Sequence, residues 1–375
     1  MSGLRLAALA ATTALAVVLP SGASAAPKDR EPTGRTPYVV HLRDGVDARG
    51  VARAVEAQTT HVYSAALSGF AARLTDGQVR QLRGRGDVLT VEADAVFRAV
   101  TTQTSPPWGL DRVDQRSGTL DSRYTYGATG AGVTAYVIDT GIATTHAQFG
   151  GRAANVYDAF GGNGQDCNGH GTHVAGTIGA STYGVAKQVR LRGLRVLSCA
   201  GSGSTSGILA AVDWLRRNAA RPAVANMSLG GGYSSSLNAG VRNLNDSGVF
   251  VSLAAGNENR DACTTSPASA SGTLAVAASD RAGQRASFSN FGSCVDLYAA
   301  GVGVTSTWLS GGTRSISGTS MAAPHAAGVA ALYKSARGDV TSSSLLTWLT
   351  GAATTGAVAG NPSGTPNRLL YKSTL

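Results

Sequence analysis

The sequence predicts an α/β protein in which a mostly parallel sheet is covered by helices on both faces, preceded by a smaller α+β domain. Residues 101–375 alternate nearly continuous apolar runs, which are typical of buried parallel strands, with longer segments of helical spacing. Residues 38–94 show a shorter pattern of strands and helices, bounded on each side by polar, proline-containing segments. A chain of 375 residues with 43% hydrophobic residues can bury two separate cores.

The first 25 residues have the organisation of a secretory signal. Arg5 supplies a positive charge, residues 6–19 form an apolar stretch, and Ala23-Ser24-Ala25 is a small-residue cleavage site. The apolar stretch is shorter than the ~20 residues that a membrane-spanning helix needs, and no other segment qualifies. We therefore expect a secreted protein without a membrane anchor, whose signal is removed after Ala25.

Residues 26–100 are predicted to form a small domain with its core at about 38–94. A polar, proline-rich lead-in precedes a series of strands and helices. A capping-box pattern at Thr75–Gln78 predicts the start of its second helix. The expected strands are Tyr38–Leu42, His61–Ala66, Gly69–Leu74 and Val88–Val91, with a first helix over 46–57. The resulting order β-α-β-β-α-β is that of a ferredoxin-like unit, which ends near Val100 before a second polar linker containing Pro106-Pro107.

The region 101–375 is predicted to be a three-layer α/β domain. The expected strands are Val133–Ile138, Leu191–Leu197, Ala223–Leu229, Val249–Ala254, Thr273–Ala278 and Val295–Ala299. The expected helices are Thr172–Ile178, Thr205–Ala219, Ser236–Asn245, Thr319–Arg337 and Ser342–Thr350. Ligands of such folds bind beyond the carboxyl ends of the strands, so polar residues at those ends are the candidates for function.

The charge and the cysteines exclude some classes of function. The net charge of +10 is scattered along the chain without a basic run that contains aromatic residues, so we expect no nucleic-acid partner. Four cysteines in an exported chain indicate two disulfides, and the residues alone leave three pairings open. No Cys-x-x-Cys pair is present, which argues against a zinc site.

Two of the candidate catalytic residues are Asp139 and His170. Asp139 ends a buried apolar strand, where a carboxylate serves either as a structural acceptor for loop N–H groups or as an acid that orients a base. His170 begins a predicted helix, and an imidazole between a carboxylate and a hydroxyl is a general base. The alternatives are a buried structural histidine or a metal pair with His173, although the His-Glu-x-x-His motif is absent.

The other two candidates are Asn257 and Ser320. Asn257 follows a predicted strand, where its amide could donate to an oxyanion or simply form a turn. Ser320 lies where a glycine-containing loop leads into a long apolar helix. It could be a helix N-cap, or a nucleophile placed where the positive end of the helix helps to bind an oxyanion.

Taken together, these segments resemble the subtilisin superfamily of serine proteases. The matching motifs are Asp-Thr-Gly (139–141), His-Gly-Thr-His-Val-Ala-Gly (170–176), Ala-Ala-Gly-Asn (254–257) and Gly-Thr-Ser-Met-Ala-Ala-Pro-His (318–325). The resemblance extends from Trp108 to Tyr371 and is strongest to the proteinase K branch, especially to aqualysin-like enzymes, in the segments 108–115, 162–170 and 226–232. The segment 68–74 is similar to subtilase propeptides. An α/β-hydrolase is disfavoured because Ala322 stands where its nucleophile motif requires glycine.

The resemblance implies the role of each catalytic residue. Ser320 would attack the scissile carbonyl, His170 would carry the proton, and Asp139 would orient the imidazole. Asn257 and the backbone N–H of Ser320 would bind the oxyanion. The substrate would pair with the edge formed by Ser228, Leu229 and Gly230, next to a roomy apolar pocket left by Gly230, Ala254 and Gly256.

The resemblance also implies disulfides, a propeptide and structural calcium, with no catalytic metal. The expected pairs are Cys167–Cys199 and Cys263–Cys294, and residues 26–100 would assist folding, inhibit the enzyme and be cleaved off. One calcium ion would be held by Asp296 with the carbonyls of Ser271 and Thr273. A second would be held by Asp111, Asp114 and Gln115, with Asp121 as a further candidate. The alternative is that these acids pair with nearby arginines.

The sequence therefore predicts a secreted, monomeric serine endopeptidase of broad specificity, with a preference for apolar or aromatic side chains. Its partners would be protein and peptide substrates and its own propeptide. A catalytically silent subtilase fold used for binding is the alternative, and a metallohydrolase using His170 and His173 is a weaker one.

Overall fold

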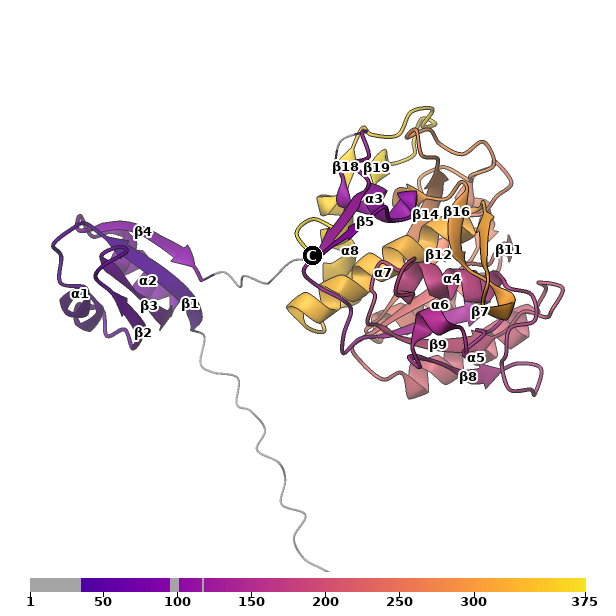
Figure 1. Cartoon of the computed structure of the whole chain (residues 1–375), viewed down its shortest axis with the longest axis horizontal. Coiled ribbons are helices and arrows are strands. Elements are labelled where there is room, and N and C mark those ends of the chain that lie inside the picture. Colours follow the sequence, from indigo (N-terminus) through magenta and orange to yellow (C-terminus); the bar gives the residue numbers. More distant parts are fainter. Residues whose placement is uncertain (1–34, 95–100, 117) are drawn as a thin grey trace, which may run out of the picture. The chain divides into compact units, whose positions relative to one another are not determined.

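The computed structural model describes residues 35–94, 101–116 and 118–375, which belong to two compact units (Figure 1). One unit ends at Phe97 and the other begins at Arg98. The predicted signal segment and the predicted cleavage position near Val100 lie outside the described residues. Within the described residues, no helix is both long enough and apolar enough to span a bilayer.

The first unit is a four-stranded antiparallel sheet packed against two helices. Its elements are β1 Thr36–Leu42, α1 Ala48–Ala54, β2 Thr59–Tyr63, β3 Gly69–Leu74, α2 Asp76–Arg83 and β4 Val88–Ala93, with the strand order β2-β3-β1-β4. This confirms the predicted ferredoxin-like order, and the Thr75–Gln78 capping box is formed. The first helix is shorter than predicted, because the Asp47 side chain accepts from Arg49 N and so starts the helix at Ala48.

The second unit is built on a nine-stranded, mostly parallel sheet with the order β18-β19-β15-β14-β12-β10-β7-β9-β8. The six predicted strands are present as β7 Thr134–Asp139, β9 Arg190–Arg195, β10 Ala223–Met227, β12 Val249–Ala254, β14 Leu274–Ser279 and β15 Leu297–Ala300. Three strands of this sheet were not predicted: β8 Ala153–Asp158, β18 Thr354–Thr355 and β19 Arg368–Leu369. β8 lies at an edge and is only half-buried along its length, so it lacks the apolar run by which the central strands were found.

Helices cover both faces of this sheet and make it the middle of three layers. The helices are α3 Trp108–Asp114, α4 His170–Gly179, α5 Thr205–Asn218, α6 Ser235–Asp246, α7 Thr319–Arg337 and α8 Ser342–Ala352. Alternate residues of β7 face different cores: Val137 packs with α4 and α7, while Ile138 packs with α5 and α6. The long helix α7 is buried on nearly all sides, which its many alanines permit.

The sequence predicted a polar linker around Pro106-Pro107. This segment is instead part of the folded second unit. Residues Thr101–Thr104 form β5, which pairs antiparallel with β6 Arg123–Tyr126, and α3 follows directly after Pro107. This polar strand is held by backbone bonds to β6 and by the Gln103 side chain, which accepts from Lys187 Nζ at 2.7 Å. The remaining short elements are β11 Gly231–Gly232, β13 Thr265–Ser266, β16 Val304–Thr307, β17 Thr313–Ile316 and the 3-10 turns Ala147–Phe149, Ala262–Thr264 and Leu309–Gly311.

The order of the strands places a crevice beside β7. From β7 the chain first builds β8 and β9 on one side and then crosses to β10 on the other. The loops after β7 and β10 therefore diverge, which leaves room for a ligand at the carboxyl ends of these two strands.

Candidate active site

Asp139 and His170 meet at the carboxyl end of β7. Asp139 is the last residue of β7 and is fully buried, and His170 is the first residue of α4. His170 Nδ1 lies 2.7 Å from Asp139 Oδ1, and Thr140 N donates to the same oxygen at 2.7 Å. Gly169 precedes His170 with φ +104°, and a Cβ there would lie 2.4 Å from Trp308, so only glycine fits this turn.

The environment of His170 raises the pKa of its imidazole above the ordinary 6.5. Burial alone would lower the pKa, but the charge of Asp139 and its hydrogen bond favour the imidazolium, and the charge of Asp166 adds to them. Because Nδ1 donates to the carboxylate, Nε2 of the neutral ring is an acceptor. The His170–Asp139 pair can therefore take up a proton at His170 Nε2.

A second carboxylate, Asp166, connects the end of β7 to the start of α4. Its Oδ1 accepts from the Thr140 hydroxyl at 2.8 Å and from Gly169 N at 2.9 Å, and its Oδ2 accepts from Thr172 N at 2.9 Å. The Thr140 hydroxyl in turn accepts from Gly171 N at 2.9 Å. These bonds tie the end of β7 to the start of α4 and so hold the two residues of the pair at a constant distance.

His173 has a structural role rather than a metal-binding one. Its Nε2 lies 3.0 Å from the carbonyl oxygens of both Val304 and Arg314, which belong to the two strands of the β16–β17 hairpin. Burial lowers the pKa of His173 to about 4. The described residues contain no cluster of three or more His, Cys, Asp or Glu side chains suited to a metal ion. The ring thus fastens the β16–β17 hairpin to α4.

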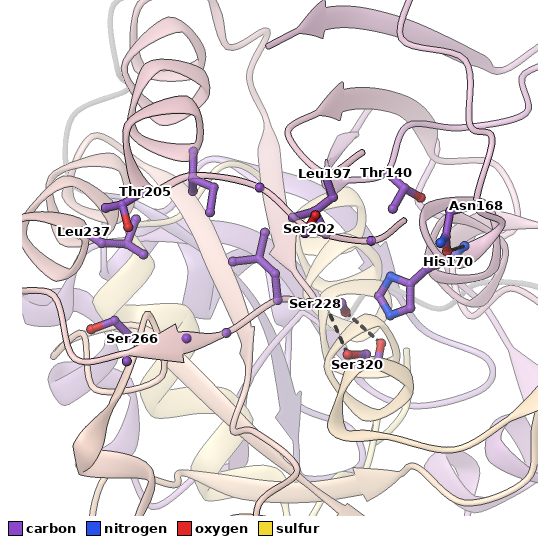
Figure 2. A pocket seen from close by; sticks show the side chains of 17 residues that line it. Thr140, Asn168, His170, Leu197, Ser202, Thr205, Ser228, Leu237, Ser266 and Ser320 are labelled. Atoms are coloured by element: carbon purple, nitrogen blue, oxygen red, sulfur yellow. Dashed lines mark hydrogen bonds between the residues drawn. The ribbon is translucent and has the colours of Figure 1, made fainter. Parts of the chain in front are cut away.

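Ser320 lies in the same pocket as His170 and is not the cap of its helix. The N-cap of α7 is Gly318, and Ser320 is the second helical residue. Its hydroxyl donates to the carbonyl of Ser228 at 3.2 Å, and the described contacts include no hydrogen bond between Ser320 and His170. Both residues line one end of the pocket drawn in Figure 2. Hydrogen bonds between a nucleophile and its base are often long or absent without substrate, so this arrangement is compatible with a pair that forms when substrate binds.

Asn257 faces outward from the loop after β12 with its amide orientation already set. Its Oδ1 accepts from Thr319 N at 2.8 Å and from the Thr319 hydroxyl at 2.9 Å. Because both bonds engage the oxygen, the amide nitrogen is left to donate elsewhere. The start of α7 has no side-chain cap, so the N–H of Ser320 is also available to an anion.

The pocket has a cavity volume of about 510 Å³ and follows an exposed backbone edge. Ser228, Leu229 and Gly230 form one side, and the facing side is the segment 201–203. The apolar part of the lining consists of Leu197, Ile208, Leu229 and Leu237.

The neighbouring strand β12 brings Ala254 and Gly256 beside this edge. Met227 pairs with Leu253, so Ser228 continues opposite Ala254, and Gly256 follows two residues later. Neither residue is among those that line the cavity. Gly256 has φ +106°, and a Cβ there would lie 2.2 Å from the Asn290 amide. Both the backbone conformation and the lack of space therefore require glycine at this position.

Comparison with known proteins identifies the family. Residues 130–368 match the subtilase family, Peptidase S8, and residues 37–99 match the peptidase inhibitor I9 family. The chain belongs to the subtilase family. It is 51% identical over 319 residues to the extracellular serine proteinase of Thermus sp. (strain Rt41A), covering 84% of this chain and 78% of that protein. It is 44% identical to proteinase R of Parengyodontium album, covering 90% and 88% respectively.

The fold of this subtilase is also that of a solved relative. The crystal structure of a cold adapted subtilisin-like serine proteinase superimposes with a TM-score of 0.71 at 52% identity, covering 72% of this chain and 99% of that one. The subtilisin-like fold and the serine protease class that the sequence predicted are therefore confirmed. An inhibitor-type domain precedes the peptidase domain, as expected.

This subtilase has two disulfides, and one of them lies beside the site. Cys167 is bonded to Cys199 and Cys263 to Cys294, which are the pairs that the resemblance implied. The first joins the loop before His170 to the loop after β9, where Asn168 Nδ2 also donates to Cys199 O at 2.9 Å. It therefore stiffens one wall of the pocket.

The predicted calcium ligands fall into two groups, and Asp296 belongs to the one that fits a cation. Asp296 is half-buried, its Oδ2 accepts from Ala275 N at 2.8 Å, and burial raises the pKa of its carboxyl to about 6. Thr273 lies just before β14, which pairs with β15 beside Asp296, and Ser271 lies in the same loop. A partly desolvated carboxylate and backbone carbonyls are the types of oxygen donor that suit Ca²⁺.

Asp111, Asp114 and Gln115 fit a cation poorly. The two oxygens of Asp111 accept from Asp121 N at 3.3 Å and Ser122 N at 2.8 Å. Asp114 accepts from Thr125 N at 2.7 Å and forms an ion pair with Lys372 at 2.9 Å. The expected pairing of these acids with arginines is not seen at Asp114, whose partner is a lysine.

Sequence reasoning missed several residues that shape the site. Thr319, which orients Asn257, lies inside a recognised motif, but its side-chain contact joins segments 62 residues apart. The wall at 201–203 is a Gly-Ser stretch without a distinctive pattern, and two of the four apolar lining residues, Ile208 and Leu237, come from α5 and α6. Asp166, which fixes the Asp139–His170 pair, was also not predicted. Its only signal in the sequence is its position four residues before His170.

Proposed function

We propose that this subtilase is a secreted endopeptidase that hydrolyses peptide bonds through Asp139, His170 and Ser320. The observation that carries the proposal is the 2.7 Å contact between His170 Nδ1 and Asp139 Oδ1, with Ser320 in the same pocket. The neutral imidazole accepts the proton of the Ser320 hydroxyl as its oxygen attacks the carbonyl carbon. Asp139 holds the tautomer that leaves Nε2 free and stabilises the imidazolium that forms.

Charge on the carbonyl oxygen is stabilised by two donors in this proposal. The Asn257 amide nitrogen and the backbone N–H of Ser320 bind the oxyanion of the tetrahedral intermediate. The imidazolium of His170 then gives its proton to the leaving amine, which releases the first product and leaves an acyl-enzyme. Water attacks the ester in the same way, with His170 again as the base.

The shape of the pocket supports an extended substrate and an apolar preference. A peptide would add as a strand to the edge at Ser228–Gly230, and backbone pairing of this kind reads no particular side chain. Leu197, Ile208 and Leu237 offer an apolar surface to the substrate. Gly230, where a Cβ would have Ser266 O at 3.8 Å as its nearest neighbour, leaves room for a large side chain at this edge. Specificity would thus be broad, with a preference for apolar or aromatic residues.

The whole chain is proposed to be a precursor. Residues 1–25 would direct export, and residues 26–100 would act as an intramolecular inhibitor that the enzyme removes near Val100. The I9 match supports the inhibitor role, and relatives are named extracellular or cuticle-degrading proteases. Calcium held by Asp296 with the carbonyls of Ser271 and Thr273 would stabilise the fold and take no part in the chemistry.

The test compares the full secreted chain with its Ser320→Ala and Ser315→Ala variants. Ser315 is an exposed serine on β17 and serves as the matched control. Each protein is followed by intact mass and by hydrolysis of succinyl-Ala-Ala-Pro-Phe p-nitroanilide, and is treated with a fluorophosphonate. We expect the wild type and Ser315→Ala to lose the first ~100 residues, cleave the anilide and take up one label, and Ser320→Ala to do none of these.

Two outcomes would contradict the proposal. If the folded wild type stays at full length, inactive and unlabelled, the binding-protein alternative is favoured. If Ser320→Ala cleaves the anilide as fast as the control, Ser320 is not the nucleophile.

A further inference from the structure

The acidic cluster at Asp111 and Asp114 contains a cation supplied by the chain itself. We propose that the ammonium group of Lys372 takes the place of a calcium ion beside Asp114, so that this cluster binds no calcium in this subtilase. The proposal concerns stability and does not depend on the catalytic roles proposed above.

The Lys372 side chain is built into the protein as a fixed cation. It is only 3% exposed, although a lysine loses much hydration when it is buried. Its ammonium lies 2.9 Å from Asp114 Oδ1 and donates to the backbone oxygens of Leu375 at 2.9 Å and Ser373 at 3.3 Å. An ammonium has three N–H groups, so these three oxygens satisfy it completely. The ring of Tyr124, 5.8 Å away, adds a cation–π contact.

The carboxylates of Asp111 and Asp114 already accept hydrogen bonds from the backbone, and the one carboxylate oxygen without such a bond, Asp114 Oδ1, faces the Lys372 ammonium. Asp114 Oδ2 accepts from Thr125 N, and both oxygens of Asp111 accept from backbone N–H groups. Calcium requires six to eight oxygen ligands at 2.3–2.6 Å. An ion bound to Asp114 Oδ1 would stand within a few ångströms of the Lys372 ammonium, and two cations at that distance repel strongly in a buried setting. The lysine and the ion therefore exclude each other.

Lys372 also connects separate segments of the domain, as a bound ion would. Lys372 N donates to Val113 O at 2.8 Å, so the backbone and the side chain of this residue both hold the end of α3. Asp114 in turn holds β6 through Thr125. A single side chain thus joins the segment after β19 to α3 and β6, a connection that a chelator cannot remove.

The experiment counts bound calcium ions by titration calorimetry and equilibrium dialysis, with CaCl₂ as the probe. All proteins are full-length chains carrying Ser320→Ala, which prevents self-cleavage during the titration. The variants are Asp114→Asn, Lys372→Met and, as the matched control, Lys334→Met. Lys334 is equally buried and lies 2.7 Å from Asp339, away from every expected calcium ligand.

We expect Asp114→Asn to bind as many calcium ions as its parent. We expect Lys372→Met to bind one more, because no cation then lies beside Asp114 Oδ1, and calcium should raise its unfolding temperature more than that of Lys334→Met. Loss of one ion in Asp114→Asn would overturn the proposal, since calcium would then be bound at Asp114. An unchanged count in folded Lys372→Met would also overturn it, because the lysine would not be what excludes the ion. If Lys372→Met does not fold, the count for Asp114→Asn decides by itself.

Discussion

Thr319 is predicted to control catalysis without touching the substrate. It is fully buried, and its hydroxyl donates to Asn257 Oδ1 at 2.9 Å while accepting from Gly256 N at 3.1 Å. Thr319→Val keeps the shape of the side chain but removes both bonds. The side chain of Asn257 then keeps a single hydrogen bond, from Thr319 N at 2.8 Å, and its amide can turn away from the oxyanion.

The size of the effect follows from the bonds that are lost. One hydrogen bond contributes about 0.5–1.5 kcal/mol net, so weakening the orientation of Asn257 by that amount should lower kcat roughly twofold to thirteenfold. Removing the donor altogether with Asn257→Leu should lower kcat by about 10²–10³, the range known for the corresponding donor in subtilisin, a member of the same family. KM should change little in both variants, because the donor acts on charge that develops in the transition state. The unpaired Gly256 N–H should also cost Thr319→Val about 1–3 kcal/mol of stability.

The assay is steady-state hydrolysis of the peptide anilide, with active sites titrated by an irreversible serine reagent so that unfolded protein does not count as lost catalysis. Thr319→Ser is the matched control because it keeps both hydroxyl bonds, and it should retain the wild-type kcat. If Thr319→Val and Thr319→Ser have the same kcat while Asn257→Leu is strongly impaired, the hydroxyl does not orient the amide and the reasoning is refuted.

Three further predictions concern acid, disulfides and calcium. Because the pKa of His170 is raised above 6.5 and the base must be neutral, kcat/KM should fall as the pH drops through that pKa. Asp139→Asn should move this limb to lower pH and lower kcat by about 10⁴, and an unmoved limb in the pH–rate profile would assign the titration to another group. Replacing Cys263 and Cys294 by alanine opens a loop with a sequence separation of 31. The free energy of unfolding, measured in urea, should fall by about 3–4 kcal/mol, and a fall below about 1 kcal/mol would contradict the loop-entropy argument. Calcium should raise the melting temperature of the wild type but not that of Asp296→Asn, and an equal rise in both would place the ion elsewhere.

The sequence by itself predicted the elements with strong local patterns. The strands β7, β10 and β12 are continuous apolar runs, because both of their faces are buried, and such runs can be recognised without any tertiary information. The capping box at Thr75 was equally local, since both of its hydrogen bonds join residues three positions apart. The boundary of α1 and the edge strand β8 were missed, because a capping aspartate and a half-buried edge leave weaker signals than a core strand.

The candidate catalytic residues were also found in the sequence, but their arrangement was not. The motifs around Asp139, His170, Asn257 and Ser320 pointed to a family, and the family supplied the roles. That Ser320 is inside its helix and not its cap depends on Gly318 taking the cap position, which a motif does not reveal.

Only the tertiary structure decided the contacts between distant segments. Thr319 reaches Asn257 across 62 positions, and Lys372 reaches Asp114 from the other end of the domain. In both cases the two side chains come within hydrogen-bonding distance only after the sheet and helices have packed. No periodicity in the sequence indicates that distance. The sequence determined which elements form and which residue types reach the sheet edge, because these follow from local patterns of burial and hydrogen bonding. Packing decided which of those side chains meet, because a hydrogen bond or ion pair requires two groups within about 3 Å, a distance set only by the completed fold.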